Sequence, residues 1–123
     1  MSECEHSLIA YELDETSAAR ARAVAQTILM NRGAKHTLAK QLAEAWVVNR
    51  DYLLAPNSTR ADFIIGNPPY IRLEEIPEET ATVYRNAYPT MRGRADLYVA
   101  FFEAALRQLK RGGVCAFICA DRW

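Results

Sequence analysis

The stretch Asp62-Phe-Ile-Ile-Gly-Asn-Pro-Pro-Tyr70 decides the fold of this chain. Its first half is a continuous apolar run, which is typical of a parallel strand that is buried on both faces. Two consecutive prolines then end the strand, because proline has no backbone N–H to donate to a neighbouring strand. We therefore expect a buried strand over residues 62–67 that ends at Asn67.

Outward from this strand, apolar spacing predicts alternating strands and helices. Short apolar or β-branched runs predict further strands at residues 7–13, 47–53 and 114–119. The remaining predicted elements are helices at residues 16–31, 38–46 and 95–110, the last stopped by Gly112-Gly113, a turn at 56–59, and a loop with one short helix at 73–94. Such alternation means parallel pairing through right-handed crossovers. The expected fold class is α/β, with a doubly wound parallel sheet.

Composition and charge restrict the class of protein. The 123 residues hold 15 Lys+Arg and 15 Asp+Glu, so any contact with nucleic acid must be local rather than a property of an overall basic chain. The three cysteines and two histidines have no zinc-ligand spacing, and no metal site is expected. The sequence carries neither a signal peptide nor an apolar run of membrane-spanning length. A reduced, cytoplasmic chain of one domain is expected, in which Cys115 and Cys119 are buried thiols.

Polar side chains follow the predicted strands at the point where each strand ends. These residues are Glu12, Asp51, Asn67 and Asp121. Because ligands of doubly wound sheets bind at the carboxyl ends of the strands, the four side chains are expected to converge on one edge.

Glu12 has the position of an acid that accepts hydrogen bonds from ribose hydroxyls. Such an acid lies about 20 residues beyond a glycine-rich turn, which here would precede Met1. The five glycines contain no GxG, so the chain is expected to lack the first strand and its loop. The alternatives are a solvated strand-end acid for Glu12 and a turn or cap residue for Asp51.

The segment Asn67-Pro68-Pro69-Tyr70 predicts a site for a planar, aminated base. The prolines fix the backbone and remove two donors, which leaves the Asn67 side-chain oxygen and the Pro68 carbonyl as acceptors for the two N–H groups of an exocyclic amine. Tyr70 offers a ring for stacking, a role that Phe could also fill. The alternative is that Asn67 is a turn former before the prolines.

At this point the chain resembles the adenine-specific DNA methyltransferases of restriction–modification systems. The resemblance runs from about Ile9 to Trp123. The matching segments are Ile9-Ala-Tyr-Glu-Leu-Asp14, Arg50-Asp-Tyr-Leu53, Ala61-Asp-Phe-Ile-Ile-Gly-Asn-Pro-Pro-Tyr70, Ala95-Asp-Leu-Tyr-Val-Ala-Phe101 and Leu109-Lys-Arg-Gly-Gly-Val-Cys-Ala-Phe-Ile118. The resemblance implies a partial, Rossmann-like catalytic domain over residues 1–123, S-adenosylmethionine as cofactor, and a flipped adenine of double-stranded DNA as substrate.

The resemblance also implies roles for single residues. Glu12 would hold the cofactor ribose, Asp51 with Tyr52 its adenine, and Phe101 would pack against that adenine. Asn67 and Pro68, followed by Pro69, would bind the target amine, and Tyr70 would stack on the flipped base. The family's glycine-rich cofactor loop, later strands and target-recognition domain have no counterpart in the chain. Weak or no binding of S-adenosylmethionine to the chain alone is therefore expected.

Two alternative functions remain open. A protein-glutamine methyltransferase has a similar strand–NPPY arrangement, and a glutamine amide also offers two N–H groups. A non-catalytic remnant or subunit that binds DNA or a partner chain would fit the missing cofactor loop.

Several charged and aromatic residues are expected to be structural. Arg85, Arg92 and Arg94 with Tyr84 and Tyr88 could contact phosphates, but a solvated loop of mixed charge is favoured. Asp96 is expected to stabilise the first turn of the helix that follows it.

The missing first strand also predicts association. In the arrangement that the chain resembles, this strand lies between the strands at residues 7–13 and 62–67. We expect the gap to be closed in one of three ways: by direct pairing of those two strands, by a strand from a second copy, or by a complementing N-terminal piece.

Overall fold

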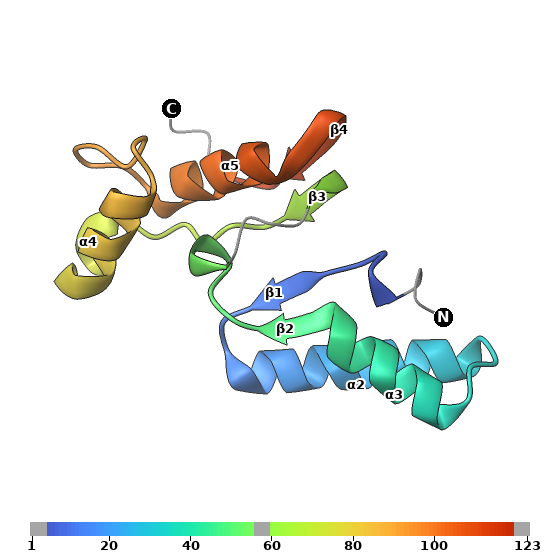
Figure 1. Ribbon diagram of the computed structural model, residues 1–123. Helices are drawn as coiled ribbons and strands as arrows, with labels where there is room; N and C mark the ends of the chain where they lie inside the picture. The colour runs from blue at the N-terminus through green and yellow to red at the C-terminus, as the bar shows by residue number, and fades with distance from the viewer. Residues whose placement is uncertain (1–4, 56–59, 120–123) are drawn as a thin grey trace. The chain divides into compact units, whose positions relative to one another are not determined.

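The computed structural model describes residues 5–55 and 60–119 and divides the chain into two compact units, Met1–Tyr52 and Leu53–Trp123 (Figure 1). Cys4, the turn expected at residues 56–59 and the strand-end acid Asp121 lie outside the described residues.

Unit 1 is a pair of short parallel strands with two helices. Its elements are β1 (Ala10–Glu12), α2 (Glu15–Asn31), α3 (His36–Trp46) and β2 (Val47–Asn49). In the register of the strands, Ala10 lies opposite Val47 and Glu12 opposite Asn49. α2 begins where the Asp14 carboxylate accepts a hydrogen bond of 2.7 Å from the Ser17 amide. The core of unit 1 includes Ala18, Ala39, Leu42, Ala43 and Val47.

Both strands of unit 1 are shorter than the sequence predicted. β1 covers residues 10–12 rather than 7–13, because α3 continues to Trp46 and leaves no strand opposite the residues before Ala10. β2 covers residues 47–49 rather than 47–53, because the chain turns after Asn49 into the 3-10 helix η1 (Tyr52–Leu54). The predicted helices at residues 16–31 and 38–46 correspond to α2 and α3.

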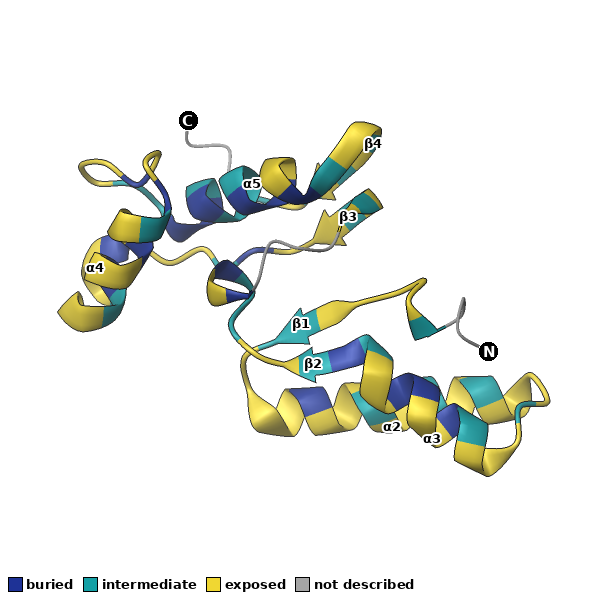
Figure 2. Cartoon of the chain, in the orientation of Figure 1, coloured by how far each residue is buried: buried dark blue, intermediate teal, exposed yellow. Residues whose placement is uncertain are grey.

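Unit 2 holds a second parallel pair, with its core on α5. Its elements are β3 (Ala61–Gly66), the 3-10 helix η2 (Leu73–Glu75), α4 (Glu78–Ala87), α5 (Leu97–Gln108) and β4 (Leu109–Phe117). β3 is thus within one residue of its predicted bounds, and α4 is the one short α-helix expected within residues 73–94. The buried face of α5 in Figure 2 carries Leu97, Tyr98, Ala100, Ala104 and Ala105. Tyr88 is also buried, and its hydroxyl donates a hydrogen bond of 2.5 Å to the Leu53 carbonyl.

The junction between α5 and β4 differs from the prediction. α5 ends at Gln108 and β4 starts at Leu109, so Gly112-Gly113 do not stop the helix. Ala61 pairs with Leu109 and Phe63 with Val114, which places residues 110–113 opposite Asp62 alone, in a bulge. Gly112 has a φ of +83° there, and a Cβ on Gly113 would lie 3.0 Å from the Asp62 carbonyl oxygen. The two glycines permit the bulge rather than a helix end.

The architecture is therefore mixed α/β with parallel strand pairs, as two sheets rather than the one sheet predicted. Among the described strands, β1 pairs only with β2, and β3 only with β4. Within the described residues β1 does not pair with β3, so the direct pairing that was one of the expected outcomes is not found. No helix within residues 5–55 and 60–119 is both long and apolar enough to cross a membrane.

Candidate functional site

The end of β3 presents the residues that the sequence singled out for base binding. Asn67 and Tyr70 are exposed, Pro68 is buried, and Pro69 is half-buried. The Tyr70 hydroxyl donates a hydrogen bond of 2.9 Å to the Asn67 side-chain oxygen. Because an amide oxygen has two lone pairs, this bond orients Asn67 and leaves it able to accept a second donor.

This hydrogen bond was missed by the sequence reasoning, which gave Tyr70 only a ring to stack. The two residues are three apart in the sequence, on either side of the prolines, and this spacing alone did not indicate a hydrogen bond. The phenol is therefore more than an aromatic face, and the expectation that Phe could replace Tyr70 takes no account of this bond.

Packing at the end of β3 fixes the approach to Asn67. The Gly66 carbonyl accepts a hydrogen bond of 3.0 Å from the Ile118 amide. A Cβ on Gly66 would lie 3.1 Å from the Phe117 ring, whose centroid is 5.0 Å from that of Phe102 on α5. Glycine lets the end of β3 approach the Phe117 ring closely, and that ring in turn contacts Phe102 of α5.

The segment after Tyr70 is fixed to the start of α5. The Leu97 amide donates to the Ile71 carbonyl at 2.9 Å, and the Leu73 amide donates to the Ala95 carbonyl at 3.3 Å. The four motif residues are thus anchored on both sides by backbone hydrogen bonds.

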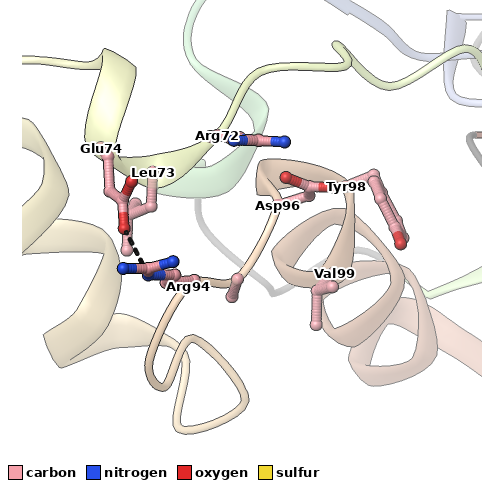
Figure 3. A pocket seen from close by; sticks show the side chains of 8 residues that line it. Arg72, Leu73, Glu74, Arg94, Asp96, Tyr98 and Val99 are labelled. Atoms are coloured by element: carbon pink, nitrogen blue, oxygen red, sulfur yellow. Dashed lines mark ion pairs between the residues drawn. The ribbon is translucent and has the colours of Figure 1, made fainter. Parts of the chain in front are cut away.

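A pocket of about 490 Å³ lies beside this anchor (Figure 3). Its wall includes the ion pair between Arg94 and Glu74, 3.5 Å apart, and the buried Tyr98. Arg72 and Asp96 form a backbone bridge there, and Asp96 occupies the N-cap of α5. Asp96 is thus at the N-terminus of the helix, as expected, and its side chain makes no capping hydrogen bond. No pattern in the sequence signalled this pocket.

In unit 1, Glu12 and Asp51 lie at the same end of the β1–β2 pair. Glu12 is half-buried, and its carboxylate accepts a hydrogen bond of 3.0 Å from the Asp14 amide. The Asn49 side-chain amide donates at 2.9 Å to the carbonyls of both Glu12 and Leu13, which joins the strand ends. Since Glu12 is opposite Asn49, the half-buried Asp51 follows two residues beyond that pair.

An aromatic pair accompanies these acids. The rings of Tyr11 and Tyr52 have centroids 5.6 Å apart at an interplanar angle of 50°. Tyr11 and Asn49 were missed by the sequence reasoning, because neither belongs to a recognisable spacing. The structure thus gathers Glu12, Asp51 and Tyr52 in unit 1, while Asn67, Pro68, Pro69, Tyr70 and the half-buried Phe101 belong to unit 2.

The aromatic residues of the loop at 73–94 belong to the core. Tyr84 and Tyr88 are buried, and the Arg107 guanidinium lies 5.1 Å from the centroid of the Tyr88 ring. Arg85 pairs with Glu78 at 3.2 Å. These tyrosines are therefore not available as stacking platforms for nucleotides.

The two described cysteines are less enclosed than predicted. Cys115 and Cys119 are free thiols and are half-buried rather than fully buried. Desolvation raises the pKa of the Cys115 thiol, which keeps it protonated at neutral pH.

Comparison with known proteins identifies the chain's relatives. The family model described as Eco57I restriction-modification methylase matches residues 9–123. The Type II methyltransferase M.XhoI of Xanthomonas vasicola is 44% identical over 114 residues, which are 93% of this chain and 21% of that protein. M.PaeR7I of Pseudomonas aeruginosa is 42% identical, covering 93% of this chain and 20% of that protein. M.BstVI of Geobacillus stearothermophilus is 37% identical over 102 residues, which are 80% of this chain and 18% of that protein.

The chain thus spans about a fifth of the length of these curated relatives. The family match extends over nearly all of the chain and includes every described residue discussed above as part of a candidate site. The chain belongs to the Eco57I restriction-modification methylase family.

Proposed function

We propose that residues 1–123 are part of the catalytic domain of a site-specific DNA methyltransferase that acts on the N6 amine of adenine. The observation that carries the proposal is the side-chain oxygen of Asn67, oriented by the Tyr70 hydroxyl beside the buried Pro68 at the end of β3. The proposed fold of the complete domain is the doubly wound sheet of S-adenosylmethionine-dependent methyltransferases, to which the two parallel pairs would contribute four strands.

In this proposal the chain's own residues prepare the amine. The Asn67 oxygen and the Pro68 carbonyl each accept one N–H of the exocyclic amine, so that the nitrogen lone pair is less delocalised into the ring. Acceptors oriented in advance stabilise the transition state without reorganisation. Tyr70 stacks on the base, which must leave the duplex to reach these groups, at a cost of a few kcal/mol.

The residues at the end of the β1–β2 pair fit an adenosyl cofactor. In the proposal, Glu12 supplies a carboxylate for ribose hydroxyls, and Asp51 and Tyr52 supply an acceptor and a ring for the cofactor adenine. For Phe101, in unit 2, the role of packing against that adenine rests on the family resemblance alone. S-adenosylmethionine would supply the electrophilic methyl group when bound. Tyr11 would support the Tyr52 ring through the aromatic contact between them.

The relatives favour DNA over a protein glutamine amide as the substrate. Their names describe Type II methyltransferases, and the family is a restriction–modification family. The proposal includes a cytoplasmic location, because a DNA substrate and the free thiols at Cys115 and Cys119 both fit a reducing compartment.

A chimera tests the proposed function. The segment of M.XhoI that matches this chain is replaced by the chain, and the chimera is expressed in a host that lacks adenine methylation. Mass spectrometry of nucleosides from the host DNA is expected to detect N6-methyladenine. Methylated cytosine instead, or no methylated base from a folded chimera, would contradict the proposal.

Asn67→Ala in the chimera tests the residue that carries the proposal. Removing one preorganised acceptor is expected to lower kcat by about 100- to 1000-fold, with little change in the Kd for S-adenosylmethionine. The matched control is Asn86→Ala, because Asn86 is exposed on α4. Equal losses of rate and cofactor affinity in Asn67→Ala would argue against its role at the amine.

A further inference from the structure

The pocket beside the motif residues 67–70 is built from two short segments of unit 2. Residues 72–74 and 94–99 meet there, joined by the backbone hydrogen bonds on either side of Arg72 and Asp96. The Leu73 and Tyr98 side chains in its wall are buried, and its volume of about 490 Å³ is in the range of ligand sites. The pocket is thus a hollow with apolar side chains in its wall, formed by hydrogen-bonded backbone.

Two arginines line this pocket, one from each segment (Figure 3). Arg72 lies opposite Asp96 in the backbone bridge, and residues opposite each other across a bridge carry their side chains on the same side. The described residues nonetheless include no ion pair of Arg72, either with Asp96 or with another acid. Within that part of the chain, Arg72 is a cation without a paired anion.

Arg94 is the second cation of the pocket. Its Nε atom lies 3.5 Å from a Glu74 carboxylate oxygen, and its side chain is 92% exposed. An ion pair as exposed as this one adds little stability, so an anionic ligand can replace Glu74 at small cost. The sequence left a phosphate contact open for Arg85, Arg92 and Arg94, and of these three only Arg94 lines the pocket.

The pocket lies close to the proposed base site. Arg72 follows Tyr70 by two residues, which span at most about 7 Å of extended chain. A base that stacks on Tyr70 is still joined to its neighbours through sugar and phosphate, because flipping rotates a nucleotide about an intact backbone. The phosphates of that strand therefore pass within reach of the long Arg72 side chain.

We propose that the pocket binds the sugar and phosphate of a nucleotide next to the target base, with Arg72 and Arg94 as the phosphate contacts. This inference rests on the proposed DNA methyltransferase function. Arginine can give two N–H donors to one phosphate, and the apolar wall at Leu73 suits the face of a sugar. Such contacts carry no sequence information, but they set the position of the strand, so that the target base reaches Asn67.

The acidic residues of the pocket limit what it can hold. Asp96 lies opposite Arg72, and Glu74 lies beside Arg94. Two carboxylates beside two guanidinium groups leave no large excess of positive charge, so a second anion in the same pocket is disfavoured. The site therefore suits one phosphate held in one orientation.

Equilibrium binding of the M.XhoI chimera to a duplex with the M.XhoI recognition site tests the inference. Fluorescence anisotropy gives the Kd at several salt concentrations. Arg72→Ala is expected to weaken binding by about 10-fold and to reduce the slope of log affinity against log salt by about one, because one phosphate contact is lost. Arg72→Lys keeps the charge and is expected to restore the slope, although not the two-donor contact.

Arg111→Ala is the matched control. Arg111 is also an exposed arginine of unit 2, but it lies in the β4 bulge opposite Asp62, at the start of β3 rather than at its end. Its replacement removes the same charge and is expected to leave the Kd and the salt slope nearly unchanged. Circular dichroism compares the folding of all the variants.

Neutral phosphates locate the contact on the DNA. A methylphosphonate, which has no charge, replaces one phosphate of the site at a time. At one position the replacement is expected to weaken binding of the unmodified chimera about as much as Arg72→Ala does. It should add little to the effect of Arg72→Ala, because both changes remove the same contact. Additive effects at every position would overturn the inference.

The remaining outcomes separate this inference from the proposed function. An unchanged salt slope in Arg72→Ala, in a chimera that methylates adenine, would overturn the inference and leave the function intact. Coupled losses in a chimera that methylates cytosine would contradict the function and leave the phosphate contact intact. A free deoxynucleoside monophosphate that binds only when Arg72 is present, without coupling to the duplex, would replace DNA as the ligand. A folded chimera that binds no DNA would contradict both.

Discussion

Asn67 and Tyr70 are joined by a hydrogen bond between their side chains and act together. The sequence predicted an acceptor at Asn67 because an amide precedes two prolines at the end of an apolar strand. It could not predict that the Tyr70 hydroxyl would bond to that acceptor, because the bond depends on the backbone path from Asn67 to Tyr70. Pairings of this kind depend on backbone direction, which residue types alone do not specify.

Tyr70→Phe separates stacking from orientation. The ring remains, so binding of the target base is expected to change little, whereas loss of the hydroxyl should lower kcat of the chimera by about 2- to 10-fold. Tyr70→Ala should also weaken base binding. Single-turnover kinetics with enzyme in excess over DNA, at several enzyme concentrations, would measure both effects. A Tyr70→Phe enzyme at full rate would show that the hydroxyl bond is unimportant.

At the scale of elements, the sequence predicted the interiors of elements better than their ends. β3 was predicted to within one residue, because its apolar run ends in prolines that forbid continuation. β4 began five residues before its predicted start, since its glycines form a bulge opposite Asp62, and bulges follow from strand pairing rather than local pattern. The lengths of β1 and β2 were overestimated, because a strand extends only as far as its partner strand pairs with it.

Glu103 connects α5 to the segment around Thr90 and makes that connection sensitive to pH. Its carboxylate accepts hydrogen bonds from the Thr90 amide, at 3.1 Å, and from the side chains of Thr90 and Arg107. Desolvation raises the pKa of Glu103, but these hydrogen bonds and the Arg107 charge outweigh it and lower the pKa overall. Because the pKa of Glu103 is lower in the folded than in the unfolded state, its ionised carboxylate stabilises the fold at pH values above the unfolded pKa. This stabilisation is lost as the pH falls through the folded-state pKa.

Glu103→Gln tests this dependence. The unmodified chain is expected to lose stability towards urea as the pH falls from neutral through the carboxyl range, and Glu103→Gln should show a smaller loss over the same range. Urea titrations followed by circular dichroism at several pH values give the comparison. Parallel curves for the two proteins would show that other carboxylates account for the acid sensitivity.

For the whole molecule, the sequence predicted parallel strands and helices but not their division into two units. One doubly wound sheet was expected from the alternation of elements, and two parallel pairs were found. Alternation specifies that neighbouring strands are parallel, but it does not specify that every strand finds a partner on both sides. Among the described strands, β1 and β3 each pair on one side only.

The isolated chain is expected to bind S-adenosylmethionine weakly or not at all. Its five glycines contain no GxG, so the chain lacks the turn that lets backbone amides approach such a cofactor closely. The Glu12 carboxylate is also partly occupied by the Asp14 amide. Isothermal titration calorimetry would test this, and a Kd in the micromolar range for the isolated chain would contradict it.

Association of the isolated chain is the second expectation at this scale. β1 and β3 each pair on one side only, and unpaired strand edges recruit further strands. Size-exclusion chromatography with light scattering should find species larger than the 13.9 kDa monomer. Hydrogen exchange should be faster at residues 10–12 and 61–66 than in α5. A monodisperse monomer with strong protection in both strands would refute this.

The prolines that end β3 also affect how readily the polypeptide aggregates before it has folded. Phe63-Ile-Ile-Gly-Asn67 is an uncharged segment with the length at which intermolecular aggregation can start. On its N-terminal side lie the charged residues Arg60 and Asp62, and the Asp62 carboxylate is paired with Lys110 at 2.8 Å. On the other side Pro68 and Pro69 cannot extend a growing stack of strands. The residues proposed to bind the target base would therefore also limit amyloid-like growth, and replacing both prolines should shorten the lag time of fibril formation.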